Sequence, residues 1–218
     1  MQCHIKVSDL ALTFSWNTHR KTIFKDLNLC IPRGSFVTLV GGNGSGKSSL
    51  IKLILGLIRP DQGEIMVLDK RVRPGYPEDV RHGQIAYLSQ QIEDLFFAET
   101  VAEELHYFAG GVPPNSWDDF AHALGLSPLL DRTVESLSGG ERQSLALAQF
   151  INTSASLLIM DEPSSYLDHA KSTLLQARLK QEHSAGKTIL HVSQFETELA
   201  WGTHVIDLDQ DPVQLVAR

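Results

Sequence analysis

The chain has 218 residues, of which 42% are apolar, and it carries 26 acidic against 19 basic side chains. This length and composition suffice for one folded domain with a buried core and argue against a disordered chain. The net charge is -7 and Lys and Arg form no block, so no nucleic-acid partner is expected.

The cysteines and the lengths of the apolar stretches predict the redox compartment of the chain and its relation to the membrane. Cys3 and Cys30 are the only cysteines, and the chain shows no signal-peptide pattern. We therefore expect two buried free thiols in a reducing compartment and no disulfide framework. The longest apolar stretches, Leu53 to Ile58 and Leu157 to Met160, fall far short of the ~20 residues that span a bilayer. A soluble or peripheral chain is expected, with any spanning helices supplied by other subunits.

Strand and helix signals alternate along the chain, as in an α/β sheet with crossover helices. Lys47 to Ile58 places apolar residues on one helical face. Asp61-Gln62-Gly63 predicts a turn. Strands are predicted at Ala11 to Trp16, Phe36 to Val40, Glu64 to Leu68, Ile85 to Leu88, Leu157 to Met160, Thr188 to Val192 and Val205 to Leu208.

Between Gln90 and about Asn152 the pattern changes to helical periodicity without a convincing strand. Gly110-Gly111 and Pro113-Pro114 interrupt it. We therefore expect one domain over 1–218. Within it, 1–89 and 152–218 would form the α/β core with its β subdomain, and 90–151 an inserted helical lobe.

A phosphate-binding loop is predicted between the strand that ends at Val40 and the helix that follows. The segment reads Gly41-Gly42-Asn43-Gly44-Ser45-Gly46-Lys47-Ser48, followed by Ser49. Its glycines let backbone N–H groups converge on phosphates, and the helix start adds a positive dipole end. Lys47 is expected to bridge the β- and γ-phosphates and Ser48 to ligate Mg²⁺. The motif predicts binding of ATP with Mg²⁺; the alternative is a Gly-rich turn.

A carboxylate pair is predicted at the end of a second buried strand. Leu157 to Met160 is followed directly by Asp161 and Glu162. Asp161 would hold Mg²⁺ through water, and Glu162 would polarise the attacking water as a general base. Strand ends commonly carry solvated acidic residues, so this pair indicates a catalytic site only because the chain also contains a phosphate-binding loop.

Leu137-Ser138-Gly139-Gly140-Glu141 supports two interpretations. Ser138 and Glu141 form a capping-box pattern that opens a helix over Glu141 to Ile151. The glycines also leave backbone N–H groups bare at that helix start, where a phosphate could bind.

Together these motifs resemble those of the ATP-binding cassette (ABC) family over nearly the whole chain. Leu137 to Gly140 matches the family's LSGG signature, and the 23-residue spacing from Ser138 to Asp161 is similar to the family's. The resemblance implies an α/β fold, a P-loop NTPase core of mostly parallel sheet flanked by helices. An N-terminal antiparallel β subdomain and an inserted helical lobe complete it.

The resemblance also implies partners. In this family two ATPase subunits pair head to tail, so that Ser138, Gly139 and Gly140 of one would contact the γ-phosphate held by the other. Like or unlike chains could form this dimer. Transmembrane permease subunits would hold the pair at the cytoplasmic face of the cell membrane.

Three further residues occupy positions similar to the family's. Gln90 resembles the Q-loop glutamine that reaches Mg²⁺, although it could be an ordinary strand-end residue. Asp168 resembles the D-loop aspartate or is a simple helix entry. Trp16, 31 residues before Lys47, falls where an aromatic ring stacks on adenine, with a core or surface tryptophan as the alternative.

The departures from the family concern hydrolysis. Gln194 stands at the switch-histidine position, where it can donate a hydrogen bond but does not titrate like His. Slow hydrolysis is one expected result. His191 is expected to be a core or sheet-face residue. Ser144 and Gln149 occupy positions usually filled by Arg, so phosphate or interdomain contacts could be weakened there.

The leading hypothesis is the ATP-hydrolysing subunit of a membrane transporter. Gln90 to Val101 resembles the corresponding region of energy-coupling-factor importers, with Phe96 and Phe97 either lining a groove for a coupling helix or packing inside the helical lobe. A soluble cassette ATPase of DNA repair or translation is a second hypothesis. A nucleotide-dependent clamp that barely turns over, favoured by Gln194, is a third.

Overall fold

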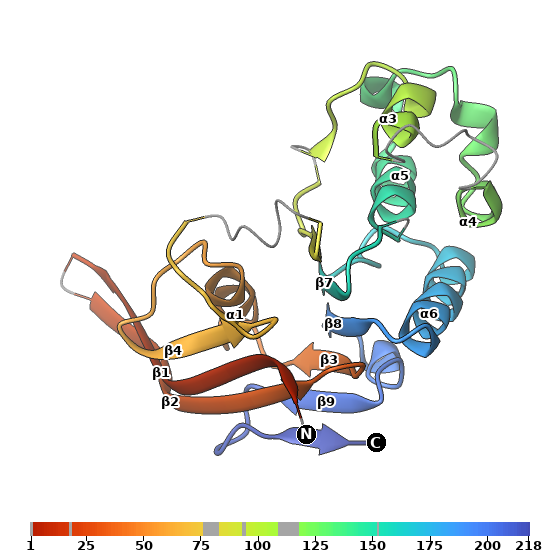
Figure 1. Ribbon diagram of the computed structural model, residues 1–218. Helices are drawn as coiled ribbons and strands as arrows, with labels where there is room; N and C mark the ends of the chain where they lie inside the picture. Colours follow the sequence, from red (N-terminus) through yellow and green to blue (C-terminus); the bar gives the residue numbers. More distant parts are fainter. Residues whose placement is uncertain (1, 18, 76–82, 93–94, 109–117, 152) are drawn as a thin grey trace.

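The computed structural model describes residues 2–17, 19–75, 83–92, 95–108, 118–151 and 153–218. Glu93, Asp94, Gly110-Gly111, Pro113-Pro114 and Asn152, which entered the predictions above, lie outside these ranges. Two sheets form the lower body of the molecule in Figure 1, and α3, α4 and most of α5 lie above them.

A six-stranded sheet carries the core, in the order β10-β9-β3-β8-β7-β6. The five strands β9, β3, β8, β7 and β6 pair with one another in parallel, and β10 pairs antiparallel with β9 at the edge of the sheet. The strands are β3 Phe36–Val40, β6 Ile85–Leu88, β7 Leu157–Asp161, β8 Thr188–Val192, β9 His204–Asp207 and β10 Leu215–Ala217.

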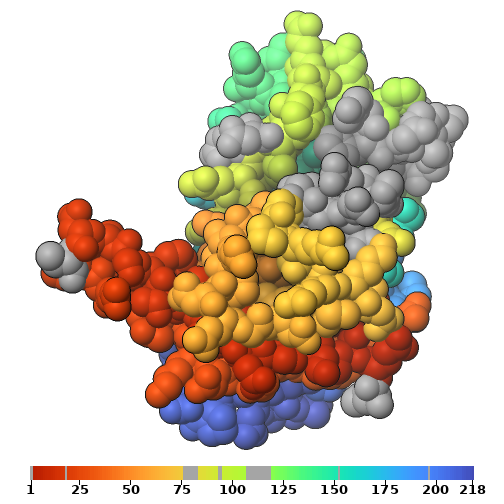
Figure 2. Space-filling model, turned by 60° about the vertical axis from the view of Figure 1, so that its left-hand side comes forward, coloured from red at the N-terminus to blue at the C-terminus, as the bar shows by residue number. Residues whose placement is uncertain are grey.

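A second, antiparallel sheet lies beside it in the order β2-β1-β4-β5. Its strands are β1 Cys3–Trp16, β2 His19–Pro32, β4 Gln62–Val67 and β5 Lys70–Arg71. The tip of the long β1–β2 hairpin projects from the body, as Figure 2 shows. The predicted α/β class with an N-terminal antiparallel β subdomain is confirmed.

The described α-helices are α1 Lys47–Ile54, α3 Val101–Phe108, α4 Asp118–Ala123, α5 Gly139–Ile151 and α6 His169–Ser184. Short 3₁₀ helices are η3 Ser127–Leu129, η4 Val134–Ser136 and η5 Glu196–Glu198. Helix α1 ends four residues earlier than its apolar pattern predicts. Gly56 follows at φ 66°, a left-handed conformation that cannot continue a right-handed helix.

Alternation along the buried strands divides the core into two layers. In β7, Leu158 and Met160 pack with the cluster that includes α5 and α6. Leu157 and Ile159 face the other way, toward α1 and the antiparallel sheet. Successive strand side chains point to opposite faces. This central sheet, buried on both faces, is therefore a rigid base for the loops at its edge.

Cys3 and Cys30 form a disulfide between β1 and β2, with their Cα atoms 5.4 Å apart. The prediction of two free buried thiols is therefore wrong, and both cysteines are only partly buried. Antiparallel pairing of the two strands places Cys30 opposite Lys6, near Cys3 across the ladder. The separation of 27 residues in sequence gives no sign of this proximity.

Candidate functional site: a cleft at the carboxyl edge of the parallel sheet

Four neighbouring strands, β3, β8, β7 and β6, run parallel and therefore end at the same edge of the sheet. The glycine loop that begins at Gly41 follows β3, and Gln194 follows β8. Asp161 ends β7 and Glu162 comes next, while Gln90 follows β6. Ligands of open α/β sheets bind at this carboxyl edge. The topology thus gathers segments that lie far apart in the sequence.

A cleft of about 670 Å³ opens at this edge. Trp16 reaches it from the end of β1, and Gln90, Glu162 and Gln194 reach it from the strand ends. The described residues that line it are Phe14, Ser15, Trp16, Lys21, Ile23, Asn43, Gly44, Gly46, Lys47, Ser48, Ser49, Gln90, Glu162 and Gln194. An exposed indole and a glycine loop in the same cleft suit a ligand that has both an aromatic ring and phosphates.

The glycine loop has the conformation that its sequence demands. Gly46 has φ 107°, and a Cβ there would lie 2.7 Å from the Phe24 ring and 2.6 Å from Ile23. Only glycine fits that close approach. No side chain of the described residues caps the start of α1, so its N–H groups are directed to the loop. The Lys47 Nζ donates to the carbonyls of Gly41 at 2.6 Å and Gly42 at 3.1 Å.

Ser48 and Asp161 meet beneath the cleft, where the Ser48 Oγ donates to Asp161 Oδ2 at 3.2 Å. Burial raises the pKa of the Asp161 carboxyl; the Ser48 hydrogen bond and Lys47 oppose this, and the nearby Glu162 carboxylate adds to it. A cation among these oxygens would offset the cost of a buried carboxylate.

The residues present fit Mg²⁺, which favours hydroxyl, carboxylate and amide oxygens together with substrate phosphates. Among the described residues, no three His, Cys, Asp or Glu side chains form a metal site of their own. Ser48, Asp161 and the Gln90 amide would therefore share the ion with the bound phosphates.

Glu162 is held in a left-handed backbone conformation, with φ 53°. That conformation costs a non-glycine residue about 1–3 kcal/mol and is found preferentially at functional sites. The Glu162 N–H donates to the Val192 carbonyl at 3.1 Å, and the Ser165 Oγ donates to the Glu162 carbonyl at 3.0 Å. The Gln90 Nε2 donates to Glu162 Oε2 at 3.1 Å. These contacts fix the carboxylate at the cleft wall.

The signature segment opens α5, and the predicted capping box is present. The Ser138 N–H donates to Glu141 Oε2 at 2.7 Å, and the Glu141 N–H donates to Ser138 Oγ at 3.3 Å. Helix α5 begins at Gly139, two residues before the predicted start. Ser138, Gly139 and Gly140 are not among the described residues that line the cleft. The structure therefore brings the other predicted site segments together and leaves this one apart.

Several cleft residues escaped the sequence analysis. Phe14 lies two residues before Trp16, on the same face of β1, and pairs with Lys21 of β2. The Lys21 Nζ donates to the Gly44 carbonyl at 3.2 Å. The Gly42 N–H donates to Asp209 Oδ2 at 2.6 Å, which ties the loop to the end of β9. Alternation around Trp16 could have indicated Phe14, but Lys21 and Asp209 depend on pairing that the sequence does not reveal.

The other residues singled out by the sequence have structural partners. Asp168 caps α6 by accepting from the Lys171 N–H at 2.8 Å, as the helix-entry alternative predicted. Ser144 donates to the Gly140 carbonyl at 2.8 Å. Gln149 donates to the buried Glu104 at 3.0 Å. His191 is fully buried on β8, as expected for a core residue.

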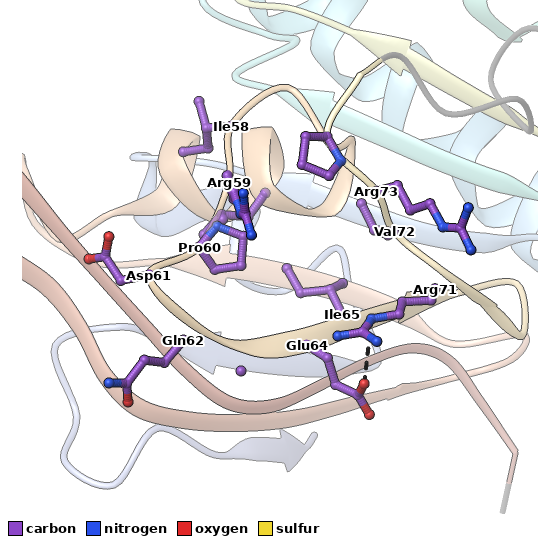
Figure 3. Close-up of a pocket in the computed structure, with 13 residues that line it drawn as sticks. Ile58, Arg59, Pro60, Asp61, Gln62, Glu64, Ile65, Arg71, Val72 and Arg73 are labelled. Atoms are coloured by element: carbon purple, nitrogen blue, oxygen red, sulfur yellow. Dashed lines mark ion pairs between the residues drawn. The ribbon is translucent and has the colours of Figure 1, made fainter.

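A second cavity, of about 410 Å³, lies between the end of α1 and strands β4 and β5 (Figure 3). Arg59, Arg71 and Arg73 border it, with an apolar floor that includes Ile65. Arg71 turns to Glu64, 3.6 Å away, and Arg73 points away from Arg59. These cations do not converge on one point, so this cavity lacks the arrangement that binds a phosphate.

A profile of the family described as "ABC transporter" matches residues 24–165, more than half of the chain. The chain therefore belongs to the ABC transporter family, and it has the ATPase cassette of that family. Among the described residues, no helix combines the length and apolar character needed to cross a membrane.

Proteins similar to this chain include short ATP-binding subunits and much longer proteins, so the chain covers very different shares of them. The chain is 32% identical, over 87% of its own length and 70% of the relative's, to the energy-coupling factor transporter ATP-binding protein EcfA1 of Leuconostoc mesenteroides. It is 34% identical to ABC transporter F family member 5 of Arabidopsis thaliana, over 80% of this chain and 24% of that protein. A dimeric ATP-binding cassette bound to ADP and Pi has a TM-score of 0.80 at 21% identity, covering 93% of each chain. That last likeness shows the cassette fold.

Proposed function

We propose that this chain binds ATP with Mg²⁺ in the cleft and hydrolyses it to power a multi-subunit membrane transporter. The observation that carries the proposal is the convergence of four parallel strand ends on one cleft that also contains Trp16. Trp16 would stack on adenine, and the loop Gly41 to Ser49 would bind the phosphates. Lys47 would leave the loop carbonyls that it now contacts and bind the β- and γ-phosphates.

Hydrolysis requires a general base, a metal ion that neutralises the phosphate charges and a hydrogen-bond donor to the γ-phosphate. Glu162 would accept the proton of the attacking water, because its carboxylate is fixed at the cleft wall by Gln90. Gln194 would donate a hydrogen bond to the γ-phosphate. Ser48, Gln90 and Asp161 would hold Mg²⁺, which neutralises charge on the phosphates. The Ser165 hydroxyl, 3.0 Å from the Glu162 carbonyl and 3.4 Å from Glu162 Oε2, would limit the motion of this carboxylate.

Each site would be completed by a second ATPase subunit. Ser138, Gly139 and Gly140 lie outside the cleft, although bare N–H groups at a helix start are suited to a phosphate. Head-to-tail pairing would bring them over the γ-phosphate of the partner chain. A solved cassette of the same fold is dimeric, which supports pairing of two such subunits.

The transporter assignment rests on the similarity to an energy-coupling factor transporter ATP-binding protein. Permease subunits would hold the chain at the cytoplasmic face of the membrane, and residues 90–151 would be the lobe that contacts them. Phe97, 75% exposed, borders a hollow of about 490 Å³ with Ala98, Glu103 and His106. A coupling helix of a permease would fit there. No nucleic-acid partner is proposed.

Single-turnover hydrolysis tests the enzymatic part. Purified wild type and Glu162→Gln, each in excess over the nucleotide, are mixed with limiting radiolabelled ATP and Mg²⁺, and mixtures without protein serve as blanks. We expect hydrolysis by the wild type and a loss of about 10²–10⁴-fold in Glu162→Gln, the range of general-base catalysis. Equal rates would refute Glu162 as the base. Co-purification of this chain with integral membrane proteins tests the transporter part, and recovery without them favours a soluble cassette.

A nucleotide-dependent clamp is a second candidate, favoured by Gln194 at the cleft. A neutral amide cannot gain charge as a histidine does. Under this alternative the wild type would dimerise on binding ATP and barely turn over. Gel filtration with ATP, combined with the hydrolysis assay, separates the two functions.

A further inference from the structure

A buried carboxylate, Glu198, joins two of the segments that form the cleft. It belongs to η5 and is 3% exposed. The Ser164 Oγ donates to its Oε1, and the Ser193 Oγ donates to its Oε2 at 2.6 Å. Both serines are themselves buried. One carboxylate thus contacts two loops that lie 29 residues apart in the sequence.

The two serines lie next to residues that are proposed to act on ATP. Ser164 comes two residues after Glu162, and Ser193 comes directly before Gln194. The Ser193 Oγ also accepts from the Phe195 N–H at 2.9 Å, and the Glu198 N–H donates to the Phe195 carbonyl at 3.0 Å. The residues on either side of Gln194, Ser193 and Phe195, are therefore both hydrogen-bonded to Glu198.

His191 supplies a further buried contact to this carboxylate. Its Nε2 lies 3.2 Å from Glu198 Oε2, and the ring is fully buried. The imidazole stacks on Trp201 with ring centres 5.0 Å apart and planes 10° apart, and Phe36 meets it edge-on. Burying an imidazole among aromatic rings is costly without a polar partner. The Glu198 carboxylate is the polar group beside it, at ion-pair distance, although neither ring nitrogen makes a well-aligned hydrogen bond within the described part of the chain.

The cluster stabilises the ionised form of Glu198. Burial raises the pKa of this carboxyl, but polar contacts with His191, Ser164 and Ser193 lower the pKa by more, so the net shift is downward. An ionised carboxylate accepts hydrogen bonds on both oxygens, as this geometry requires. A group that is charged, buried and fully engaged can hold two loops at a fixed separation.

We propose that Glu198 is a positioning residue that sets the placement of Glu162 relative to Gln194, through Ser164 and Ser193, with His191 holding its carboxylate. The proposal rests on the function proposed above, in which Glu162 and Gln194 act on ATP in one cleft. Glu198 is not among the described residues that line that cleft. Its effect is on the geometry of the reacting groups.

Glu198→Gln tests the role, with Glu182→Gln as the matched control. Glu182 is also a buried carboxylate in ion pairs, with Lys187 at 2.8 Å and Arg178 at 2.9 Å, but it lies on α6. Single-turnover hydrolysis, with each protein in excess over ATP and above its Kd, and the Kd for ATP itself are measured for the wild type and both variants. We expect Glu198→Gln to lower the rate about 10–100-fold, as small misplacements of reacting groups do. Its Kd should change less than about threefold, and Glu182→Gln should hydrolyse like the wild type.

The hydroxyls provide a second route that keeps Glu198 intact. Ser164→Ala and Ser193→Ala should each slow hydrolysis, and the double variant should lose less than the product of the two effects, because both act through one carboxylate. Thr188→Val removes another buried hydroxyl, which contacts His4 and Gly34, and should leave the rate unchanged.

The outcomes separate this proposal from the one it rests on. A wild type that hydrolyses ATP while Glu198→Gln does so equally fast overturns the positioning role alone. A rate and a Kd that worsen together in Glu198→Gln also overturn it, since the residue would then be a general structural support. A wild type that binds ATP without hydrolysing it overturns both proposals.

Discussion

The Ser48 hydroxyl lies 3.2 Å from the Asp161 carboxylate, although 113 residues separate the two in the chain. Ser48 lies in the first turn of α1, which the glycine loop connects to β3, and Asp161 ends β7, so the parallel sheet and the loop together set this distance. If the pair shares Mg²⁺, Asp161→Asn should raise the Mg²⁺ concentration that gives half-maximal hydrolysis by about 10–100-fold, the usual loss when a metal site loses a water-mediated ligand. Mg²⁺ titration at fixed ATP measures this.

ATP binding without metal provides the control for that experiment. Asp161→Asn should retain the wild-type affinity for ATP in EDTA, because the loop and Trp16 are unchanged. An equal Mg²⁺ requirement in variant and wild type contradicts the metal role of Asp161.

Trp16 is 50% exposed and lines the cleft, so its fluorescence should change when ATP binds. Trp16→Ala should raise the Kd for ATP about tenfold, since stacking of a base on an aromatic ring is worth about 1–3 kcal/mol. Trp16→Phe should recover most of the affinity. Titration with a fluorescent ATP analogue measures both variants, and a Trp16→Ala affinity equal to the wild type would show that the ring does not contact the base.

The capping box of the signature segment predicts a pH effect on stability. Hydrogen bonds from the Ser138 backbone and side chain lower the pKa of Glu141 from its ordinary 4.5, with a small opposing contribution from burial. A lowered folded-state pKa stabilises the protein above the unfolded-state pKa, and this stabilisation is lost as pH falls through the folded value. Melting curves should show wild type above Glu141→Ala at pH 7, with the difference shrinking below about pH 4.5. A constant difference contradicts the linkage.

Local patterns in the sequence predicted the parts of this molecule that are themselves local. The glycine loop, the buried strands β3 and β7 and the Ser138–Glu141 cap each lie within a few consecutive residues. Lys21 and Glu198 could not be found in this way. Lys21 reaches Gly44 through hairpin register, and Glu198 reaches Ser164 through the arrangement of loops at the sheet edge. Such contacts depend on the complete tertiary fold.

The prediction of two free thiols was wrong for the same reason, and an argument from composition added to the error. Two cysteines in a chain without a signal pattern usually remain thiols. Pairing of β1 with β2 decides the matter here, because it brings Cys3 and Cys30 within 5.4 Å between Cα atoms. The lesson is that composition predicts the usual state of a residue type, and strand pairing determines which residues meet.

Reduction of Cys3–Cys30 should lower thermal stability. Closing a loop of 27 residues is worth about 3.5 kcal/mol in the chain-entropy account. For a chain of this size that corresponds to a fall in Tm of roughly 7–14 °C. Melting curves with and without dithiothreitol measure the effect. The double variant Cys3→Ser with Cys30→Ser should melt at the lower temperature and ignore the reductant, whereas alkylation of both thiols in untreated protein would contradict the bond.

Gln194 gives the most direct test of how fast this cassette turns over. It lines the cleft and follows β8, and the residue before it, Ser193, donates to the Glu198 carboxylate. Gln194→His would place a titratable donor at the γ-phosphate, and we expect turnover to rise several-fold at pH 7 and to gain a pH dependence near 6.5. Gln194→Ala, which removes the donor, should lower turnover about 10-fold or more, since one lost hydrogen bond to a charged group is worth about 1.5–3 kcal/mol. Steady-state phosphate release by the three proteins, at equal ATP occupancy, checks the order His above Gln above Ala. Equal rates in all three would show that residue 194 makes no contact with the γ-phosphate that hydrolysis depends on.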